Sequence, residues 1–134
     1  MNSHRYTVQL RINGDIIPDD VTLELGLEPN HVRSAGTVYH GRLLESSMWS
    51  YSGASPEVFV HEWDTLEKGL LHLLNQLAPK KDVLQHYIDH YDTVWWCGHF
   101  QSGFDGGPTF SKALLLQLAS FGVPVFIDNY FSDD

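Results

Sequence analysis

The 134-residue chain is poor in cysteine and in basic residues. Cys97 is the single cysteine, so no intrachain disulfide can form and a reducing compartment is the simplest setting. Eight Lys and Arg stand against seventeen Asp and Glu, and the formal net charge is -9. Nucleic acids and anionic membranes attract proteins through Lys and Arg, so we expect neither as a partner. This charge favours either a basic protein as the partner or no partner at all.

Long hydrophobic runs are missing as well. No run of about eighteen apolar residues occurs, and the N-terminal stretch contains no apolar segment of signal-peptide length. We therefore expect a cytoplasmic protein. Hydrophobic residues nevertheless make up 43% of the chain and aromatic residues 13%, which is enough for one sizeable core. The expected organisation is a single globular domain over residues 1–134.

Signals for strands and helices can be followed along the first half of the chain. Residues 6–12 alternate between apolar and polar side chains, which predicts a half-buried strand. Pro18, followed by two acidic residues, predicts the start of a short helix that ends at Gly26. The stretch that follows is rich in turn formers, and within it residues 37–39 and 48–51 are predicted as two strands joined in a hairpin.

The second half of the chain is easier to interpret. Residues 53–56 indicate a loop, and residues 57–61 fit a strand and a helix equally well. Asp64–Glu67 then has the spacing of a capping box, and leucines follow at helical spacing until Pro79. The remaining expected elements are a helix over 81–91, a strand over 93–101, a helix over 111–122 and a strand over 123–131.

Taken in order, these elements predict one α+β domain. Its sheet is expected to be mainly antiparallel, with four to five strands and with helices packed on one face. Trp96 and Phe100 are expected to fill the core beneath those helices. Residues 102–108 are expected to form the connection to the next helix.

Four stretches, spread over most of the chain, occur in a characteristic order: IIPDDVTLELGLEPNHVRSAG, MWSYSG, LEKGLLHLLNQLAPKKDVL and FSKALLLQLASFGVPVFIDNYF. The most specific parts are the turn at Leu25–Pro29 and the terminal Asp128–Tyr130. Together the stretches resemble the bacterial family catalogued as domain of unknown function 4279. The resemblance implies a compact α+β domain, and it implies no activity, substrate, cofactor or catalytic residue.

Three clusters of reactive residue types are candidate sites. Cys97 and His99 would share one face of a strand, but about 6.6 Å of strand separates them, so a buried core cysteine is favoured over a nucleophile. His86 and His90 have helical metal-ligand spacing but lack a third ligand, so a solvated helix face is favoured. The loop at 104–108 matches no phosphate-binding motif and indicates a connector. We expect no catalytic residue, metal or cofactor.

The last strand raises the most specific possibility, because Asp128 interrupts an apolar run. If Val125 and Ile127 face the helices, Asp128 and Tyr130 share the opposite face of the sheet. Strand alternation extends that face to a candidate set for ligand or partner binding: Arg11, Trp95, His99, Asp128 and Tyr130. The alternative is that Asp128 pairs with Arg11 or His99 for structural reasons only.

The leading functional hypothesis is a non-enzymatic protein-interaction module. Its most specific version is a bacterial immunity protein that masks a basic toxin, because acidic surfaces associate quickly with basic ones. The alternative is a small-molecule or metal-binding domain, or a weak enzyme, that uses the same aromatic and acidic sheet face. RNA-binding sheets also expose aromatic residues, but they add a basic surface that this chain lacks.

Overall fold

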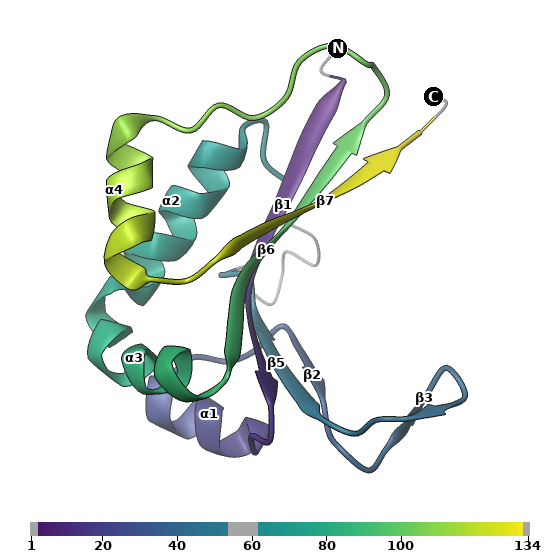
Figure 1. The fold of residues 1–134 in the computed structure, drawn as a ribbon, viewed down its shortest axis with the longest axis vertical. Coiled ribbons are helices and arrows are strands. Elements are labelled where there is room, and N and C mark those ends of the chain that lie inside the picture. Colours follow the sequence, from purple (N-terminus) through teal and green to yellow (C-terminus); the bar gives the residue numbers. More distant parts are fainter. Residues whose placement is uncertain (1–2, 54–61, 133–134) are drawn as a thin grey trace.

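A computed structural model describes residues 3–53 and 62–132 (Figure 1). In chain order its elements are β1 (His4–Gly14), α1 (Pro18–Leu25), β2 (His31–Arg33), β3 (Val38–Tyr39), β4 (Arg42–Leu43), β5 (Ser47–Tyr51), α2 (Leu66–Leu77), a 3-10 turn (Ala78–Lys80), α3 (Lys81–His90), β6 (Asp92–Gln101), α4 (Lys112–Phe121) and β7 (Val125–Phe131). Outside the stretch between α1 and α2, the predicted order of strands and helices is confirmed.

One mixed sheet of five strands organises the fold, in the order β2-β5-β1-β6-β7. All neighbouring strands are antiparallel except β6 and β7, which run parallel with α4 as their crossover. The helices lie on one side of this sheet, and the small β3–β4 hairpin extends away from its lower end (Figure 1). The predicted α+β class, with a mainly antiparallel sheet and helices on one face, is confirmed.

The helix ends follow local sequence rules. Pro18 occupies the first turn of α1, and Gly26 closes that helix with a left-handed φ of 67°. The Ser111 hydroxyl accepts a hydrogen bond from the Leu114 N–H at 3.1 Å, which caps α4, and Gly122 ends it with a φ of 71°. Such caps satisfy backbone groups that have no partner within the helix.

The start of α2 differs from the predicted capping box by one residue. The hydroxyl of Thr65, and not the carboxylate of Asp64, accepts from the Lys68 N–H, at 3.2 Å. Asp64 instead forms an ion pair with the Lys68 ammonium at 3.1 Å. Thr65 has the extended backbone of an N-cap, and its short side chain reaches the N–H of Lys68, the third residue of the helix. The N-cap is therefore Thr65 and not Asp64.

The stretch between α1 and α2 contains the largest errors of strand assignment. β3 and β5 are strands, but they do not form the predicted hairpin, since β3 pairs with β4 while β5 pairs with β1 and β2. The short edge strand β2 was not predicted. Two further predictions concern a loop over residues 53–56 and an ambiguous segment over residues 57–61. Residues 54–61 lie outside the described residues.

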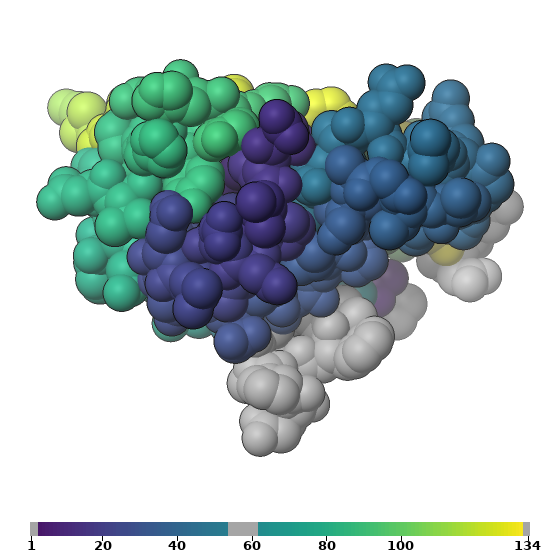
Figure 2. All heavy atoms as spheres, turned by 90° about the horizontal axis from the view of Figure 1, so that it is seen from below, coloured from purple at the N-terminus to yellow at the C-terminus, as the bar shows by residue number. Residues whose placement is uncertain are grey.

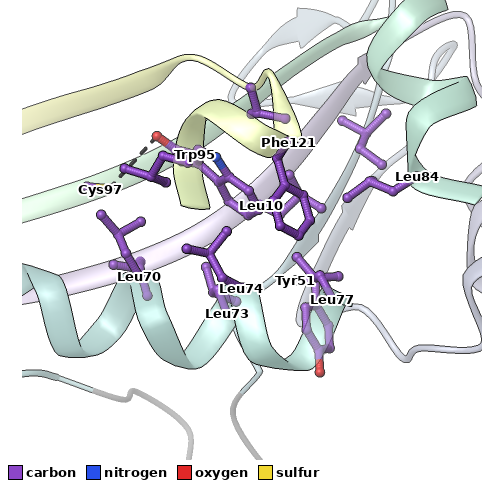
Figure 3. Close-up of a cluster of buried hydrophobic side chains, with 14 of the residues drawn as sticks. Leu10, Tyr51, Leu70, Leu73, Leu74, Leu77, Leu84, Trp95, Cys97 and Phe121 are labelled. Carbon is purple, nitrogen blue, oxygen red and sulfur yellow. Dashed lines mark hydrogen bonds between the residues drawn. The ribbon is translucent and has the colours of Figure 1, made fainter. Parts of the chain in front are cut away.

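The core lies between the sheet and the helices. Alternate residues of β1, among them Val8 and Leu10, point toward α2, whose leucines are all buried except Leu71. Figure 3 shows Trp95 and Cys97 of β6 among these leucines, next to Phe121 of α4. Within the described part of the chain, no helix is long and apolar enough to cross a membrane.

Candidate functional site

The sheet side that the helices leave uncovered carries a group of aromatic and charged side chains. Strand register assigns six of them to this side, and we refer to them together as the open face: Arg11, Trp96, Phe100, Phe126, Asp128 and Tyr130. The register pairs Trp96 with Phe126 and Phe100 with Tyr130 across β6 and β7. All six are partly or fully exposed, in contrast to the core-facing residues beside them.

The aromatic members of the open face contact each other in pairs, one tilted and one stacked. The rings of Trp96 and Phe126 have centroids 4.4 Å apart, and those of Phe100 and Tyr130 are 4.8 Å apart and nearly parallel. Phe126 and Tyr130 each remain 44% exposed. The prediction that Trp96 and Phe100 fill the core is therefore wrong, because the odd-numbered residues of β6 are the ones that face the helices.

Arg11 joins the aromatic pairs to the middle of the sheet. Its guanidinium lies 3.9 Å from the centroid of the Trp96 ring, and its Nε donates to Oε1 of Gln9 at 2.9 Å. The Gln9 oxygen also accepts from the Ser50 hydroxyl. Burial lowers the pKa of Arg11, as does the neighbouring charge of Arg33, but a guanidinium stays protonated at any physiological pH.

Asp128 and Tyr130 form a second polar contact on the open face. The Tyr130 hydroxyl donates a hydrogen bond to Oδ2 of Asp128. This bond, more than burial or charge, raises the pKa of Tyr130 above its usual value. No direct ion pair between Asp128 and Arg11 occurs among the described contacts, although the carboxylate is close enough to favour the charged form of the guanidinium.

Two of the five residues predicted for this surface lie on the other side of the sheet. Trp95 is 0% exposed and His99 is 4% exposed, and their register partners Leu10 and Tyr6 are core residues. The prediction that Trp95 and His99 share a face with Asp128 is therefore wrong. Both faces of β6 are rich in apolar residues, so alternation alone could not decide which one the helices cover.

His99 is the buried member of a polar chain at the upper end of the sheet. Its Nε2 lies 2.8 Å from Nδ1 of His4, and its Nδ1 lies 2.9 Å from Oδ1 of Asn129. The second nitrogen of His4 is 2.6 Å from the carbonyl oxygen of Asp105, and the ring of Tyr6 stacks on His99 at 4.7 Å. These contacts join β1, β6, β7 and the loop before α4, so His99 has a structural role there.

Trp95 and Cys97 are chemically inert in this position. The indole N–H of Trp95 has no hydrogen-bond partner among the described residues, and its ring meets the Phe121 ring edge-on, with centroids 5.8 Å apart. Burial raises the pKa of the Cys97 thiol to about 12. A thiol that stays protonated is no nucleophile, and the side chain packs as a small core residue.

Carboxylates gather where α1 and α3 lie side by side, the surface that faces the viewer in Figure 2. We call this region the acidic end, and its exposed members are Asp15, Asp19, Asp20, Glu24, Asp82, Asp89 and Asp92. A shallow pocket of about 160 Å³ between the two helices is lined by Asp15, Asp20 and Glu24. There the Tyr87 hydroxyl donates to Glu24 at 2.5 Å, and burial followed by this bond raises the pKa of Tyr87.

The histidine pair of α3 has a local partner. The Nδ1 atom of His90 is 2.8 Å from the carbonyl oxygen of His86, one turn earlier in the same helix. Within residues 3–53 and 62–132, no group of three His, Cys, Asp or Glu side chains is placed to hold a metal ion.

These features define an α+β domain whose sheet has one covered face and one open face lined by paired aromatic residues and arginine. The chain matches the family Domain of unknown function (DUF4279) over residues 4–132 and belongs to that family, as its sequence landmarks predicted. No curated protein and no solved structure matches the chain. The surfaces of this chain are therefore the basis for a proposed function.

Proposed function

We propose that this protein is a non-enzymatic protein-interaction module whose binding surface is the open face. The observation that carries the proposal is the row of paired, partly exposed aromatic side chains on β6 and β7, with Arg11 packed on Trp96. Trp, Tyr and Arg are the residue types that contribute most to the binding energy of protein interfaces. Here they lie on neighbouring strands of a rigid sheet.

The contacts between these rings support a binding role in a second way. Phe126 rests on Trp96 and Tyr130 rests on Phe100, so each exposed ring is already held by its neighbour. A partner therefore immobilises few rotatable side chains when it covers the open face, and the entropy lost on binding is small. Hydrogen bonds restrain the polar members of the open face in the same manner, because Arg11 donates to Gln9 and Tyr130 donates to Asp128.

The partner in this proposal is a basic protein. The net charge of -9 and the carboxylates of the acidic end attract a basic protein from a distance, whereas the open face makes the short-range contacts. The two surfaces then have separable kinetic roles. The acidic end raises the association rate, and the aromatic residues lower the dissociation rate.

Capture of the partner tests the binding surface. Tagged wild-type protein should retain a basic protein from the lysate of its host. A variant with both Phe126→Ala and Tyr130→Ala should bind the captured protein at least about 30-fold more weakly, because hot-spot residues contribute about 2 kcal/mol or more. Leu23→Ala is the matched control, since Leu23 is 80% exposed on α1, away from the open face. Equal binding by all three forms would refute the proposed surface.

Salt dependence tests the role of charge. Stopped-flow association with the captured partner should slow as ionic strength rises, because salt screens attraction between exposed charges. Asp19→Asn together with Asp20→Asn should lower the association rate and reduce its salt dependence, while the dissociation rate changes little. An association rate that is indifferent to salt would show that the partner is not selected by its basic charge.

The most specific form of the proposal is an immunity protein that masks a basic toxin. It is supported by the same pairing of long-range acidity with a preformed contact surface. Expression of the captured partner alone should stop the growth of the host, and co-expression of this protein should restore it. A partner that is harmless when expressed alone would rule out this form but leave the interaction module intact.

Binding of a small molecule is the second candidate function. A pocket of about 460 Å³ lies where α2 and α4 begin, and its lining includes Tyr6, Thr65, Lys68, Thr109 and Ser111. This volume lies within the range of small-molecule sites. A ligand found by native mass spectrometry should raise the melting temperature of the wild type, and Thr109→Trp should remove that increase by filling the pocket. A ligand whose effect survives this substitution would bind elsewhere.

A further inference from the structure

The outer edge of β7 is an unpaired strand edge within the described part of the chain. β7 is the last strand of the sheet, and its inner edge pairs with β6. The N–H of Trp95 donates to Pro124 and the N–H of Ser132 donates to Gln101. In a parallel ladder these two bonds imply that the even-numbered residues of β7 direct their backbone groups toward β6. The odd-numbered residues then direct their N–H and C=O groups outward.

This edge also lacks the features that normally prevent a strand from pairing with another chain. Native edges are usually short, charged, bulged or interrupted by proline. β7 is seven residues long, and Asp128 is its only charged residue. Its exposed side chains are mostly apolar, with Phe131 64% exposed and Val125 38% exposed.

An apolar groove runs along the same edge on the helix side. Its lining consists of Phe110, Leu115, Leu118, Val125 and Ile127, and its volume is about 230 Å³. Leu115 is 52% exposed beside it. A strand added to β7 would place every second side chain over this groove. Peptide recognition by strand addition uses alternate side chains in the same way.

We propose that the strand that occupies this edge is β7 of a second copy of the chain, paired antiparallel about a twofold axis at Asn129. The two five-stranded sheets then form one ten-stranded sheet. Because this axis is perpendicular to the sheet, the open faces of both copies lie on the same side. The inference does not depend on the proposed partner of the open face.

Two requirements favour the register centred on Asn129, namely the direction of the backbone hydrogen-bonding groups and the separation of like charges. Outward-directed residues must meet outward-directed residues, and here Ile127 of one copy pairs with Phe131 of the other. Asp128 then lies opposite Tyr130 of the second copy, whose hydroxyl already donates to a carboxylate within one chain. A register centred on Asp128 would instead place two carboxylates directly opposite each other, which destabilises a strand pair.

The same register brings a protruding side chain to the groove of the other copy. Phe131 belongs to the odd-numbered set that faces the helix side, and it is the most exposed of the large hydrophobic residues of β7. Opposite Ile127, it lies beside the groove that Ile127 lines, and the symmetry repeats this contact in the other direction. A surface that carries both a projection and its complementary groove is suited to a twofold interface.

The net charge does not oppose this pairing strongly, because the acidic end is remote from Asn129. Asn129 pairs with His99, and Asp92 of the acidic end lies seven residues earlier on β6. Seven residues of strand span about 23 Å, which exceeds the screening length of about 8 Å at physiological salt. The carboxylates of the two acidic ends are therefore largely screened from each other.

Sedimentation equilibrium of the purified chain, followed over a wide range of concentrations, tests the oligomeric state. We expect a monomer–dimer equilibrium that Phe131→Lys shifts toward the monomer at least about tenfold, because the substitution places a charge at the apolar groove. Leu23→Lys is the matched control, since it adds the same charge at an exposed leucine of α1. A wild type that is monomeric throughout, or a dimer that Phe131→Lys leaves unchanged, overturns the proposal.

Amide hydrogen exchange of the wild type tests the register without any variant. In the dimer, the N–H groups of Ile127, Asn129 and Phe131 should exchange more slowly as the protein concentration rises. The N–H groups of Asp128 and Tyr130, which face β6, should not respond to concentration. Fast exchange at Ile127 and Asn129 at every concentration would mean that no second copy covers the edge. A strand of another protein would then be the remaining candidate occupant.

Discussion

Trp95 and Trp96 are neighbours on β6, yet they belong to two regions with different tasks. Trp95 is fully buried against α4, while Trp96 lies on the open face between Arg11 and Phe126. The difference follows from the two-residue period of a strand, which sends adjacent side chains to opposite faces. One strand thus builds both the core and the surface that we assign to binding, and each face can be altered without the other.

The largest expected effect comes from truncating the two tryptophans separately. Trp95→Ala should lower the free energy of unfolding by about 3–5 kcal/mol, because it leaves a large cavity in a packed core. Trp96→Ala should cost about 1 kcal/mol, since it removes a cation–π contact and one ring–ring contact at a partly exposed site. Urea denaturation measures both values. Equal losses would contradict the assignment of the two residues to different faces.

The next comparison concerns Cys97, which lies on the covered face. Its pKa of about 12 means that very little thiolate is present at pH 8. Reaction with an alkylating reagent should therefore be more than about 100-fold slower in the native protein than in urea, where the thiol has an ordinary pKa. Mass spectrometry of the labelled protein follows the rate. Rapid native labelling would place the thiol outside the core.

His99 provides a polar test of the covered face. His99→Ala should lower the free energy of unfolding by about 1–3 kcal/mol, because it removes the partly buried hydrogen bonds of His99 to His4 and Asn129. His86→Ala, on the exposed side of α3, should change it by less than about 0.5 kcal/mol and is the control. Thermal unfolding of both variants provides the comparison. A His99→Ala variant as stable as the control would contradict the structural role.

The smallest expected effect lies beside the open face, at His31. Burial, and then the charges of Arg33 and Arg11, lower the pKa of His31 below 6.5, and its Nε2 accepts a hydrogen bond from Arg33. The unfolded chain therefore binds this proton more readily than the folded chain. Stability should fall as the pH drops through about 6.5, and this contribution should be complete above that pH.

The variant His31→Asn isolates this contribution. The loss of stability between pH 7.5 and pH 5.5 should be smaller in His31→Asn than in the wild type, because the asparagine binds no proton. Urea denaturation at the two pH values measures the difference. A larger loss in the variant would show that protonation of His31 stabilises the fold.

The sequence was sufficient to predict the elements whose boundaries depend on local chemistry. Pro18, Gly26, Ser111 and Gly122 mark helix ends because they satisfy or avoid particular backbone hydrogen bonds, and these rules operate within a few residues. The leucine spacing of α2 likewise predicted which side chains are buried. The short strands β2 and β4 have no such signal, since their pairing depends on chain segments that are distant or joined by irregular turns.

The open face could be predicted only in part. On β7, the apolar pair Val125 and Ile127 indicated the covered side, which correctly placed Asp128 and Tyr130 opposite. On β6, both faces are apolar, and the sequence offers only Gly98 as a signal. A Cβ at Gly98 would lie 2.5 Å from Oγ1 of Thr7, so a glycine is needed on the same side as Trp96. That close approach depends on the pairing of β1 with β6, which one sequence does not reveal.

The measurement that tests the central claim most directly is the affinity of the captured basic partner for Trp96→Ala, with Leu115→Ala as the control. Trp96 contacts both Arg11 and Phe126, so its removal disrupts the open face, whereas Leu115 is an exposed residue on the helix side. We predict that Trp96→Ala weakens binding at least about 30-fold and that Leu115→Ala leaves it unchanged. Binding lost only in Leu115→Ala would assign the partner to the helix side and contradict the account.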